Sequence, residues 1–267
     1  MNIRETLKHH KRIVVKIGTS TVTYPNGRIN LRRLEQLAWV LADLKNQGKE
    51  VVLVSSGAMG VGSAALGFDK RPTEIRFKQA AASVGQASLI QIYKNFFNEY
   101  NQKVAQILLT KEDIKNDERK NTASRTFETL LSMGVMPIVN NNDAVATVQF
   151  EFSDNDSLSA VVANLIHADL LVLLTDIDAL YDSNPRKNAD AKRISVVEEV
   201  TDDIMAMAGE KGSAFSVGGM ETKLIAAKMC KKTGTDMVIA LGENPKILHD
   251  IMDGADVGTL FIGRERP

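Results

Sequence analysis

The chain has 267 residues, of which 44% are hydrophobic and 25% are charged, a composition typical of globular proteins. Its 33 lysine and arginine residues balance 33 aspartate and glutamate residues, so charge does not favour nucleic acid or an anionic membrane as a partner. The single cysteine excludes an intrachain disulfide, and no apolar run reaches the roughly 20 residues of a membrane span. Because the N-terminal segment is polar and lacks a signal-peptide pattern, we expect a cytoplasmic protein.

Short apolar, β-branched runs alternate along the chain with segments of helical periodicity. Each apolar run is continuous, which is typical of strands buried on both faces of a parallel sheet. The predicted strands are 12–17, 51–54, 104–109, 135–139, 170–174 and 237–240, and the predicted helices are 31–47, 73–97, 118–133, 156–167 and 219–233.

The first of these helices shows its pattern most clearly. Residues 31–47 end before Gly48, a C-terminal cap, and carry a stripe of Leu31, Leu34, Leu37, Leu41 and Leu44. No linker rich in proline, glycine or serine divides the chain. The alternation of strands and helices therefore predicts one α/β domain, a three-layer αβα sandwich with a largely parallel central sheet.

The first predicted strand ends at Lys16 and turns through Gly18 into Thr19 and Ser20. A glycine at this point lets backbone amides approach an anion, and Lys16 adds a positive charge. The spacing of a P-loop is absent, so a tight turn beside a solvated lysine is an equally good interpretation.

The second predicted strand leads into the small residues Ser55 to Ala58 and then into Gly60 and Gly62. The resulting G-x-x-G-x-G spacing differs from the dinucleotide-binding fingerprint, which argues against a Rossmann dehydrogenase. The glycines either allow a helix to pack closely or expose amides at a helix start that bind a carboxylate or phosphate.

Two later segments also offer polar groups at element ends. Thr175 and Asp176 end a buried strand, where they can hydrogen-bond a ribose or base or can cap a turn. Gly218 and Gly219 precede a helix that carries Lys223, which suits a phosphate or is a glycine-rich helix entry with a solvated lysine.

The segment from Val139 to Ala160 gathers short amides and carboxylates in two groups, Asn140–Asp143 and Asp154–Asp156. These residues can form turns, bind a metal or line a pocket for a small polar molecule. We disfavour a metal site because amides are poor ligands beside carboxylates, and the chain has no Cys/His cluster for zinc. We expect the nine residues "AVATVQFEF" between the groups to form a hairpin-like insert.

Taken together and in this order, these segments resemble the amino acid kinase family, and within it the members that act on glutamate. The resemblance covers nearly the whole chain. It rests on "VVKIGTST", "VSSGA" (54–58), "NNNDAVAT" (140–147), "DNDSLSA" (154–160), "LLTDIDALYDSNPR" (173–186), "GGMETK" (218–223) and "VGTLF" (257–261). The segments at 140–147 and 154–160 are the most discriminating.

The resemblance implies a carbamate kinase-like fold that phosphorylates the side-chain carboxylate of L-glutamate, with ATP as donor and Mg²⁺ carried by the nucleotide. It implies no separate protein-bound metal. By matching motif positions, the implied catalytic residues are Lys16, Lys223 and Asp156, and the implied glutamate contacts are Ser56, Gly57, Ala58, Asp143 and Asn155. The implied nucleotide contacts are Lys16, Thr175, Asp176, Val217, Gly218, Gly219, Met220, Glu221, Thr222 and Lys223.

The resemblance also implies a substrate side of roughly 1–165, a nucleotide side of roughly 166–267, a homodimer or homotetramer, and feedback inhibition by proline. The chain ends where many relatives continue into a C-terminal PUA domain, so we expect the form without that domain. Three residues depart from the family pattern, namely Val217, Ala179 and Asn142.

Two other interpretations stay open on sequence alone. The chain can be another member of the family, such as an aspartate, acetylglutamate or uridylate kinase. It can also be a non-catalytic sensor of amino acids or nucleotides on the same scaffold, because a fold does not fix a function. The presence of Lys16, Lys223 and Asp156 together weighs against the sensor, which has no need of all three.

Overall fold

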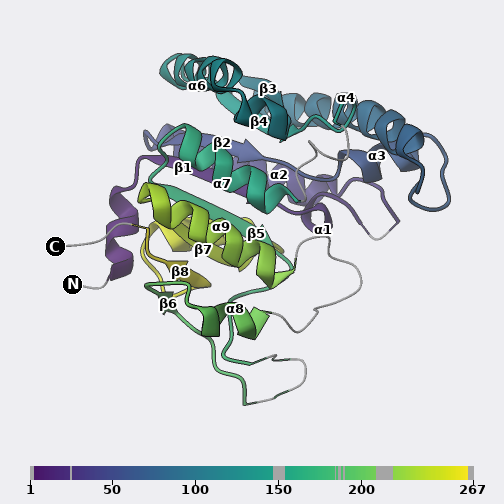
Figure 1. The fold of residues 1–267 in the computed structure, drawn as a ribbon. Coiled ribbons are helices and arrows are strands. Elements are labelled where there is room, and N and C mark those ends of the chain that lie inside the picture. The colour runs from purple at the N-terminus through teal and green to yellow at the C-terminus, as the bar shows by residue number, and fades with distance from the viewer. Residues whose placement is uncertain are drawn as a thin grey trace.

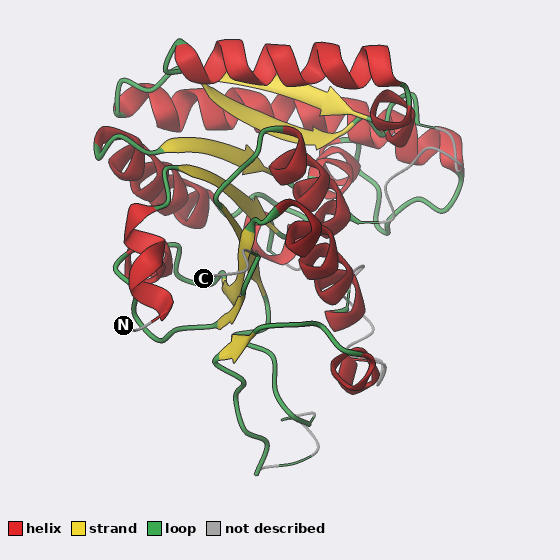
Figure 2. Cartoon of the chain, turned by 60° about the vertical axis from the view of Figure 1, so that its left-hand side comes forward, coloured by secondary structure: helices red, strands yellow, loops and turns green. Residues whose placement is uncertain are grey.

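The computed structural model describes residues 3–24, 26–146, 154–183, 185, 188, 190–208 and 219–263. They form one sheet with helices on both faces (Figure 1; Figure 2). The strands are β1 (Arg12–Ile17), β2 (Glu50–Val54), β3 (Val104–Leu109), β4 (Met136–Asn141), β5 (Leu170–Thr175), β6 (Val196–Val197), β7 (Asp236–Leu241) and β8 (Thr259–Phe261). The helices are η1 (Ile3–His9), α1 (Thr19–Val22), α2 (Leu31–Asn46), α3 (Ala58–Ala65), α4 (Ile75–Glu99), α5 (Lys111–Lys115), α6 (Asp117–Ser132), α7 (Asn155–Leu165), α8 (Asp202–Ala208), α9 (Met220–Thr233) and α10 (Ile247–Met252).

The strand order is β3-β4-β2-β1-β5-β7-β8-β6, and every neighbouring pair is parallel except β7 and β8. The predicted largely parallel sheet is therefore confirmed. At the centre, Lys16 of β1 is in register with Val54 of β2 and with Leu173 of β5. The carboxyl ends of these three strands consequently lie at one edge of the sheet, where ligands bind in open α/β folds.

Two apolar layers cover the faces of the sheet, because successive residues of a strand point to opposite sides. On β1, Ile13, Val15 and Ile17 pack with α2 and α4, whereas Val14 packs in the layer that contains α6, α7 and α9. Both layers are built mainly from buried aliphatic side chains, with a few aromatic ones such as Phe97 and Phe127. The predicted three-layer sandwich is thus confirmed, and its two cores hold the central strands rigidly in place.

The structure differs from the sequence prediction at particular points. Strand β3 lies at an edge of the sheet, so most of its residues are half-buried rather than buried on both faces, and Gln106 is exposed. Leu31 begins the stripe of α2 but is 53% exposed, because it is the first residue of the helix. The elements that escaped prediction are short, namely η1, α1, α3, α5, β6, α8, α10 and β8.

Helices α3 and α4 touch at two glycines. A Cβ atom on Gly62 would overlap the carbonyl oxygen of Ala81, and one on Gly85 would overlap the carbonyl oxygen of Ala58. The glycine-rich sequence after β2 therefore serves close packing, as one of its two interpretations predicted, although the partner at Gly62 is a helix and not the sheet. This contact fixes the position of α3 beside the carboxyl end of β2.

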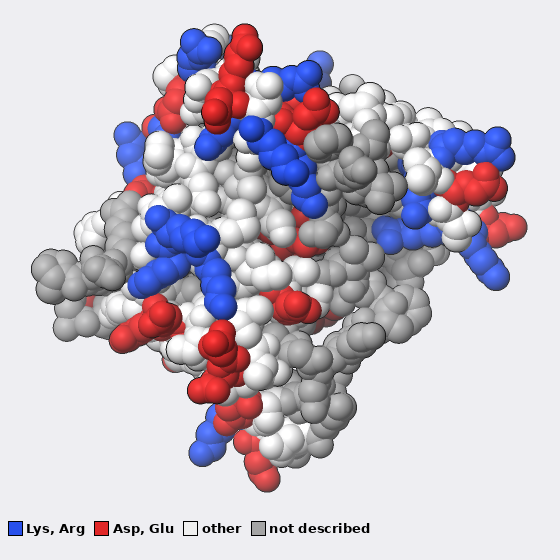
Figure 3. All heavy atoms as spheres, viewed as in Figure 1, with Lys and Arg blue, Asp and Glu red and all other residues white. Residues whose placement is uncertain are grey.

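Charged side chains of both signs are interspersed over the face shown in Figure 3, in keeping with the zero net charge. Among the described residues, no helix is both long and apolar enough to cross a membrane.

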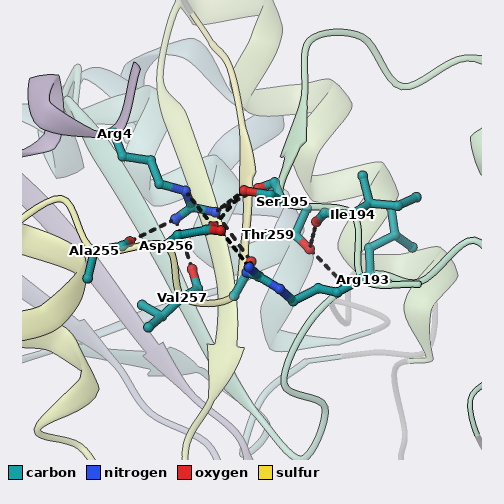
Figure 4. A network of polar contacts seen from close by, with 10 residues as sticks. Arg4, Arg193, Ile194, Ser195, Ala255, Asp256, Val257 and Thr259 are labelled. Carbon is teal, nitrogen blue, oxygen red and sulfur yellow. Dashed lines mark hydrogen bonds and ion pairs between the residues drawn. The ribbon is translucent and has the colours of Figure 1, made fainter. Parts of the chain in front are cut away.

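The two ends of the chain are tied together by a buried arginine (Figure 4). The guanidinium of Arg4, in η1, donates to the carbonyl oxygens of Ser195 at 2.6 Å and Val257 at 2.9 Å, and it lies 3.2 Å from a carboxylate oxygen of Asp256. Arg193 reaches the same carboxylate at 2.7 Å. Burial lowers the pKa of Arg4 and the charge of Asp256 counteracts it. This network secures the loop that leads into β8.

Candidate active site

A carboxylate held between two lysines lies at the carboxyl edge of the central strands. Lys16 Nζ, from β1, is 2.6 Å from Oδ1 of Asp156, and Lys223 Nζ, from α9, is 3.1 Å from Oδ2. All three residues are buried, with 7%, 1% and 2% of Lys16, Asp156 and Lys223 exposed. Burial opposes ionisation of Asp156, but the two lysine charges outweigh it and lower the pKa of this carboxyl group.

The local sequence explains how each of these groups reaches the site. Asp154 caps α7 by accepting a hydrogen bond from the backbone N–H of Ser157 at 2.7 Å, which places Asp156 in the first turn. Gly219 is the N-cap residue that precedes α9, and Lys223 follows at the end of the first turn of this helix. The hydroxyl of Thr222 lies 3.0 Å from Oδ2 of Asp156, so α7 and α9 are joined at their N-terminal ends.

Asn155, next to Asp156, connects two strand ends. Its side-chain amide Nδ2 donates to the carbonyl oxygen of Ser55 at 2.8 Å and to Oγ of Ser56 at 2.8 Å, and it lies 3.1 Å from Oδ1 of Asn140. Ser55 and Ser56 follow β2, and Asn140 belongs to β4. The backbone carbonyl of Ser55 can only accept, which fixes the orientation of the Asn155 amide. Ser56 Oγ accepts from Asn155 and keeps its own O–H proton for another acceptor.

A cavity of about 710 Å³ opens from these groups. This volume lies within the range of small-molecule binding sites. Six of the residues predicted for the site line the cavity, namely Lys16, Ser56, Asn155, Thr175, Asp176 and Lys223. Thr175 and Asp176 therefore lie on a cavity wall, and the Thr175 hydroxyl donates to Asp176 Oδ1 at 3.0 Å.

Other predicted residues lie elsewhere. Gly57, Ala58 and Asp143 are described by the structure but do not line this cavity. Gly57 has a φ of +97° and a Cβ there would lie 3.1 Å from Val22, so its backbone requires glycine. Asp143 follows β4 and accepts a hydrogen bond from Asn141. Their roles as glutamate contacts remain predictions.

The nucleotide-binding residues predicted around α9 divide in the same way. Gly219, Met220, Glu221 and Thr222 are described but do not line the cavity, whereas Lys223 does. Val217 and Gly218 lie outside the described residues, as do residues 147–152 of the insert predicted between the two polar groups.

The cavity also contains residues outside the implied site, of which Gly18, Thr19, Ser20 and Gly60 belong to turns that the sequence suggested for anion binding. Its walls continue along α1, the turn that follows it, one face of α3 and the loop after α3. These residues are Gly18, Thr19, Ser20, Thr23, Tyr24, Asn26, Gly27, Gly60, Ser63, Ala64, Phe68, Asp69, Lys70 and Arg71. In the loop after α3, the adjacent cations Lys70 and Arg71 were the one signal in the sequence that could have indicated that the loop lines the cavity.

Comparison with known proteins places the chain in a family. The sequence model of the amino acid kinase family matches residues 11–240. Two proteins with high identity are glutamate 5-kinases. One, from Clostridium perfringens, is 52% identical and the match covers 98% of this chain and 99% of the relative. The other, from Enterococcus faecalis, is 48% identical with 97% of each chain covered.

Solved structures with the same fold are more distant in sequence. UMP kinase from Ureaplasma parvum matches with a TM-score of 0.65 and 16% identity, covering 95% of this chain and 99% of its own. Isopentenyl phosphate kinase from T. acidophilum has a TM-score of 0.65 and 15% identity, with 94% and 100% covered. These likenesses concern the fold alone.

The chain therefore belongs to the amino acid kinase family, whose sequence model matches most of its length. Within that family, the relatives that share about half of its residues over nearly the whole chain carry the name glutamate 5-kinase.

Proposed function

We propose that the protein transfers the γ-phosphoryl group of ATP to the side-chain carboxylate of L-glutamate. The products are L-glutamyl 5-phosphate and ADP, and the reaction is the first step of proline biosynthesis. The observation that carries this proposal is the pair of lysines that are held on opposite oxygens of Asp156 and that both line the cavity. We take glutamate as the acceptor from the names of the relatives, glutamate 5-kinases, whose matches cover nearly the whole chain.

The acceptor needs no general base. A glutamate side chain has a pKa near about 4.3, so it is already ionised at neutral pH and can attack phosphorus directly. The barrier lies in bringing this anion to a negatively charged phosphate. Catalysis then depends on in-line positioning and on neutralising charge on the transferring group.

Lys16 and Lys223 supply that neutralisation in our proposal. The two ammonium groups would repel one another without Asp156, which is the single carboxylate described between them. Because they are fixed before the substrates arrive, no reorganisation is needed during transfer. Lys16 comes from a central strand and Lys223 from the start of a helix, so both stand on rigid elements.

Mg²⁺ would accompany ATP and neutralise charge on its phosphates. Both carboxylate oxygens of Asp156 face lysines, and the described residues contain no group of three or more His, Cys, Asp or Glu side chains that could hold a metal ion. With these side chains, we expect the metal to be held mainly by the phosphates of the nucleotide. Thr175 and Asp176 are our candidates for contacts to the nucleotide.

We assign the amino-acid acceptor to the wall formed by Ser56 and Asn155, in the predicted substrate side of roughly 1–165, and the nucleotide to the wall formed by β5 and the start of α9. The substrate's ammonium group requires an acidic or carbonyl acceptor, for which Asp143 is our candidate.

The decisive experiment traps the acyl phosphate with hydroxylamine and measures the hydroxamate with glutamate, aspartate and N-acetylglutamate as acceptors, alongside ADP release with UMP. We expect product with glutamate far above the other acceptors. Equal or greater turnover of another acceptor would assign the chain to a different kinase. Binding of ATP and glutamate without any hydroxamate would favour a sensor.

The same assay tests two further parts of the proposal. We expect added proline to inhibit competitively with glutamate. We also expect a homo-oligomer, because α4 exposes the apolar side chains of Ile75, Phe77 and Val84. Light scattering that gives the mass of one chain would contradict the second expectation.

A further inference from the structure

We propose that Tyr93 is a positioning residue for the amino-acid acceptor, because its buried hydroxyl holds the backbone from which Ser56 reaches the cavity. Tyr93 belongs to α4, does not line the cavity and was not predicted from sequence. The proposal rests on the proposed function, since it concerns the wall that we assign to glutamate.

Tyr93 and Ser55 form a polar contact inside the apolar layer that contains α2 and α4. The Tyr93 hydroxyl lies 2.8 Å from Oγ of Ser55, and 1% of Tyr93 and 2% of Ser55 are exposed. The ring of Tyr93 packs among apolar side chains, including Phe97 one turn further along α4, with ring centroids 6.4 Å apart. Burial raises the pKa of Tyr93, so its hydroxyl keeps its proton at neutral pH.

The direction of this hydrogen bond follows from a second one. The Ser55 hydroxyl donates to the carbonyl oxygen of Ser56 at 3.2 Å, so the Ser55 oxygen is left to accept the proton of Tyr93. Two hydrogen bonds therefore run in sequence from α4 to the peptide group that follows Ser56. Without the Tyr93 hydroxyl, the Ser55 hydroxyl would be free to rotate away from that carbonyl oxygen.

Ser56 is thereby held from both sides. The peptide group before it is fixed by Asn155, whose Nδ2 donates to the Ser55 carbonyl oxygen at 2.8 Å. The peptide group after it is fixed by the hydrogen bonds that begin at Tyr93. Peptide groups are planar, so φ and ψ of Ser56 are the only backbone rotations between these two groups. Fixing both groups sets the direction of the Ser56 side chain on the cavity wall.

Two glutamines on the same face of α4 make weaker contacts of this kind. Gln79, Gln86 and Tyr93 are spaced seven residues apart, close to two helical turns. Nε2 of Gln79 donates to the carbonyl oxygen of Ala146, and Nε2 of Gln86 donates to that of Asn141, both at 3.3 Å. One face of α4 thus contacts the segments at the carboxyl ends of β2 and β4. Of the three side chains, only Tyr93 is buried and it makes the shortest contact, so the proposal is made for Tyr93.

A buried tyrosine hydroxyl needs a partner in any protein, so a purely structural pair has to be distinguished from a positioning one. A structural pair would contribute to stability and leave substrate binding unchanged. Tyr93→Phe keeps the ring and its contact with Phe97 and removes only the hydroxyl. Tyr100→Phe is the matched control. Tyr100 is the C-cap residue of the same helix and lies outside the cavity, and its hydroxyl has no hydrogen bond to another described residue.

The test measures kcat and KM for glutamate and for ATP by hydroxamate formation in Tyr93→Phe, Ser55→Ala, the double variant and Tyr100→Phe. We expect Tyr93→Phe to raise KM for glutamate about 3- to 10-fold, the value of one neutral hydrogen bond, with KM for ATP within about twofold. Ser55→Ala should give a similar rise. The double variant should be no worse than either single variant, because both remove the same link. Tyr100→Phe should match the parent protein.

A second double-mutant cycle tests whether the effect passes through Ser56. A Ser56→Ala variant has no side-chain hydroxyl to orient, so adding Tyr93→Phe to it should leave KM for glutamate unchanged. Thermal unfolding midpoints show that each variant is folded. A lowered midpoint of Tyr93→Phe with unchanged KM for glutamate, an equal rise in KM for ATP, or the same rise in KM for glutamate with and without Ser56→Ala would each overturn the proposal.

The parent protein separates the failure of this inference from that of the proposed function. If the parent forms no hydroxamate from glutamate, the proposed function fails and this inference fails with it. If the parent forms the hydroxamate and Tyr93→Phe behaves like Tyr100→Phe, this inference alone fails.

Discussion

The side-chain amide of Asn155 lies 2.8 Å from the backbone carbonyl of Ser55, although the two residues are 100 positions apart in the chain. This hydrogen bond joins the start of α7 to the end of β2, and so it ties the helix that carries Asp156 to the wall that we assign to glutamate.

We expect Asn155→Asp to disrupt this junction, because a carboxylate cannot donate to the Ser55 carbonyl and would repel it. KM for glutamate should rise at least about tenfold, the cost of a hydrogen bond lost beside a charged group. Asn164→Asp, on the same helix but bonded to Met229, is the control and should leave KM unchanged. Equal effects of the two variants would show that Asn155 is not specific to the substrate.

Lys223→Met should lower kcat about 100- to 1000-fold while the protein stays folded, because one preorganised positive charge is lost at the transferring phosphate. Lys228→Met, on the same helix and outside the catalytic cavity, should retain the parent rate. Hydroxamate formation measures both. A Lys223→Met variant with near-normal kcat would remove this lysine from the chemistry.

Asp156→Asn should destabilise the fold by about 3–5 kcal/mol at neutral pH, since it leaves two buried lysines without their counter-ion. Adding Lys16→Met should restore part of the loss. Because the folded-state pKa of Asp156 is lowered, its contribution is complete above the unfolded value of about 3.9 and disappears as pH falls towards the folded value. The difference between parent and variant in denaturant unfolding should therefore shrink in acid.

Gly62→Ala should destabilise the protein by about 1–3 kcal/mol or more, because its Cβ would overlap the backbone of α4. Gly60→Ala, two residues earlier on α3, is the matched control. A Cβ there meets no heavy atom within 4 Å, so its effect on unfolding should be neutral or favourable. Equal losses in thermal unfolding would mean that the contact between α3 and α4 is looser than described.

The thiol of Cys230 should be inert in the native protein. It is buried on α9, and burial raises its pKa to about 12, so almost no thiolate forms at pH 8. An aromatic disulfide reagent should label it only as the protein unfolds, which makes the labelling rate a measure of opening at this helix. Rapid labelling of the native protein, against a Cys230→Ser blank, would contradict this expectation.

The long, periodic elements of this fold could be predicted from sequence, and several of the short ones could not. Strand β1 was predicted with its observed bounds because its sequence is a nearly continuous apolar run. In the structure, five of its six residues are buried. Helix α3 was not predicted because its small residues form no apolar stripe. Its position depends on close packing against α4, which the sequence pattern does not reveal. Strand β8 has three residues, too few for any periodicity.

The site shows the same division. Lys16, Asp156 and Lys223 could be predicted from motifs, since each lies within a short contiguous segment that can be recognised without knowing the fold. Arg71 could not, because its place on the cavity wall depends on where α3 ends in space. The orientation of Asn155 was equally beyond prediction, since it follows from a carbonyl group 100 residues away.

The buried guanidinium of Arg4 sets an order on folding during synthesis. Its partners are Ser195 and the backbone of 255–258, so the side chain of Arg4 cannot form these hydrogen bonds until residues 255–258 have been made. Contacts with such sequence separation slow folding. Strand β1, between β2 and β5, can pair with β2 early. We therefore expect the growing chain to hold a partly formed sheet while η1 is still unattached, and η1 to dock only after residues 255–258 have left the ribosome.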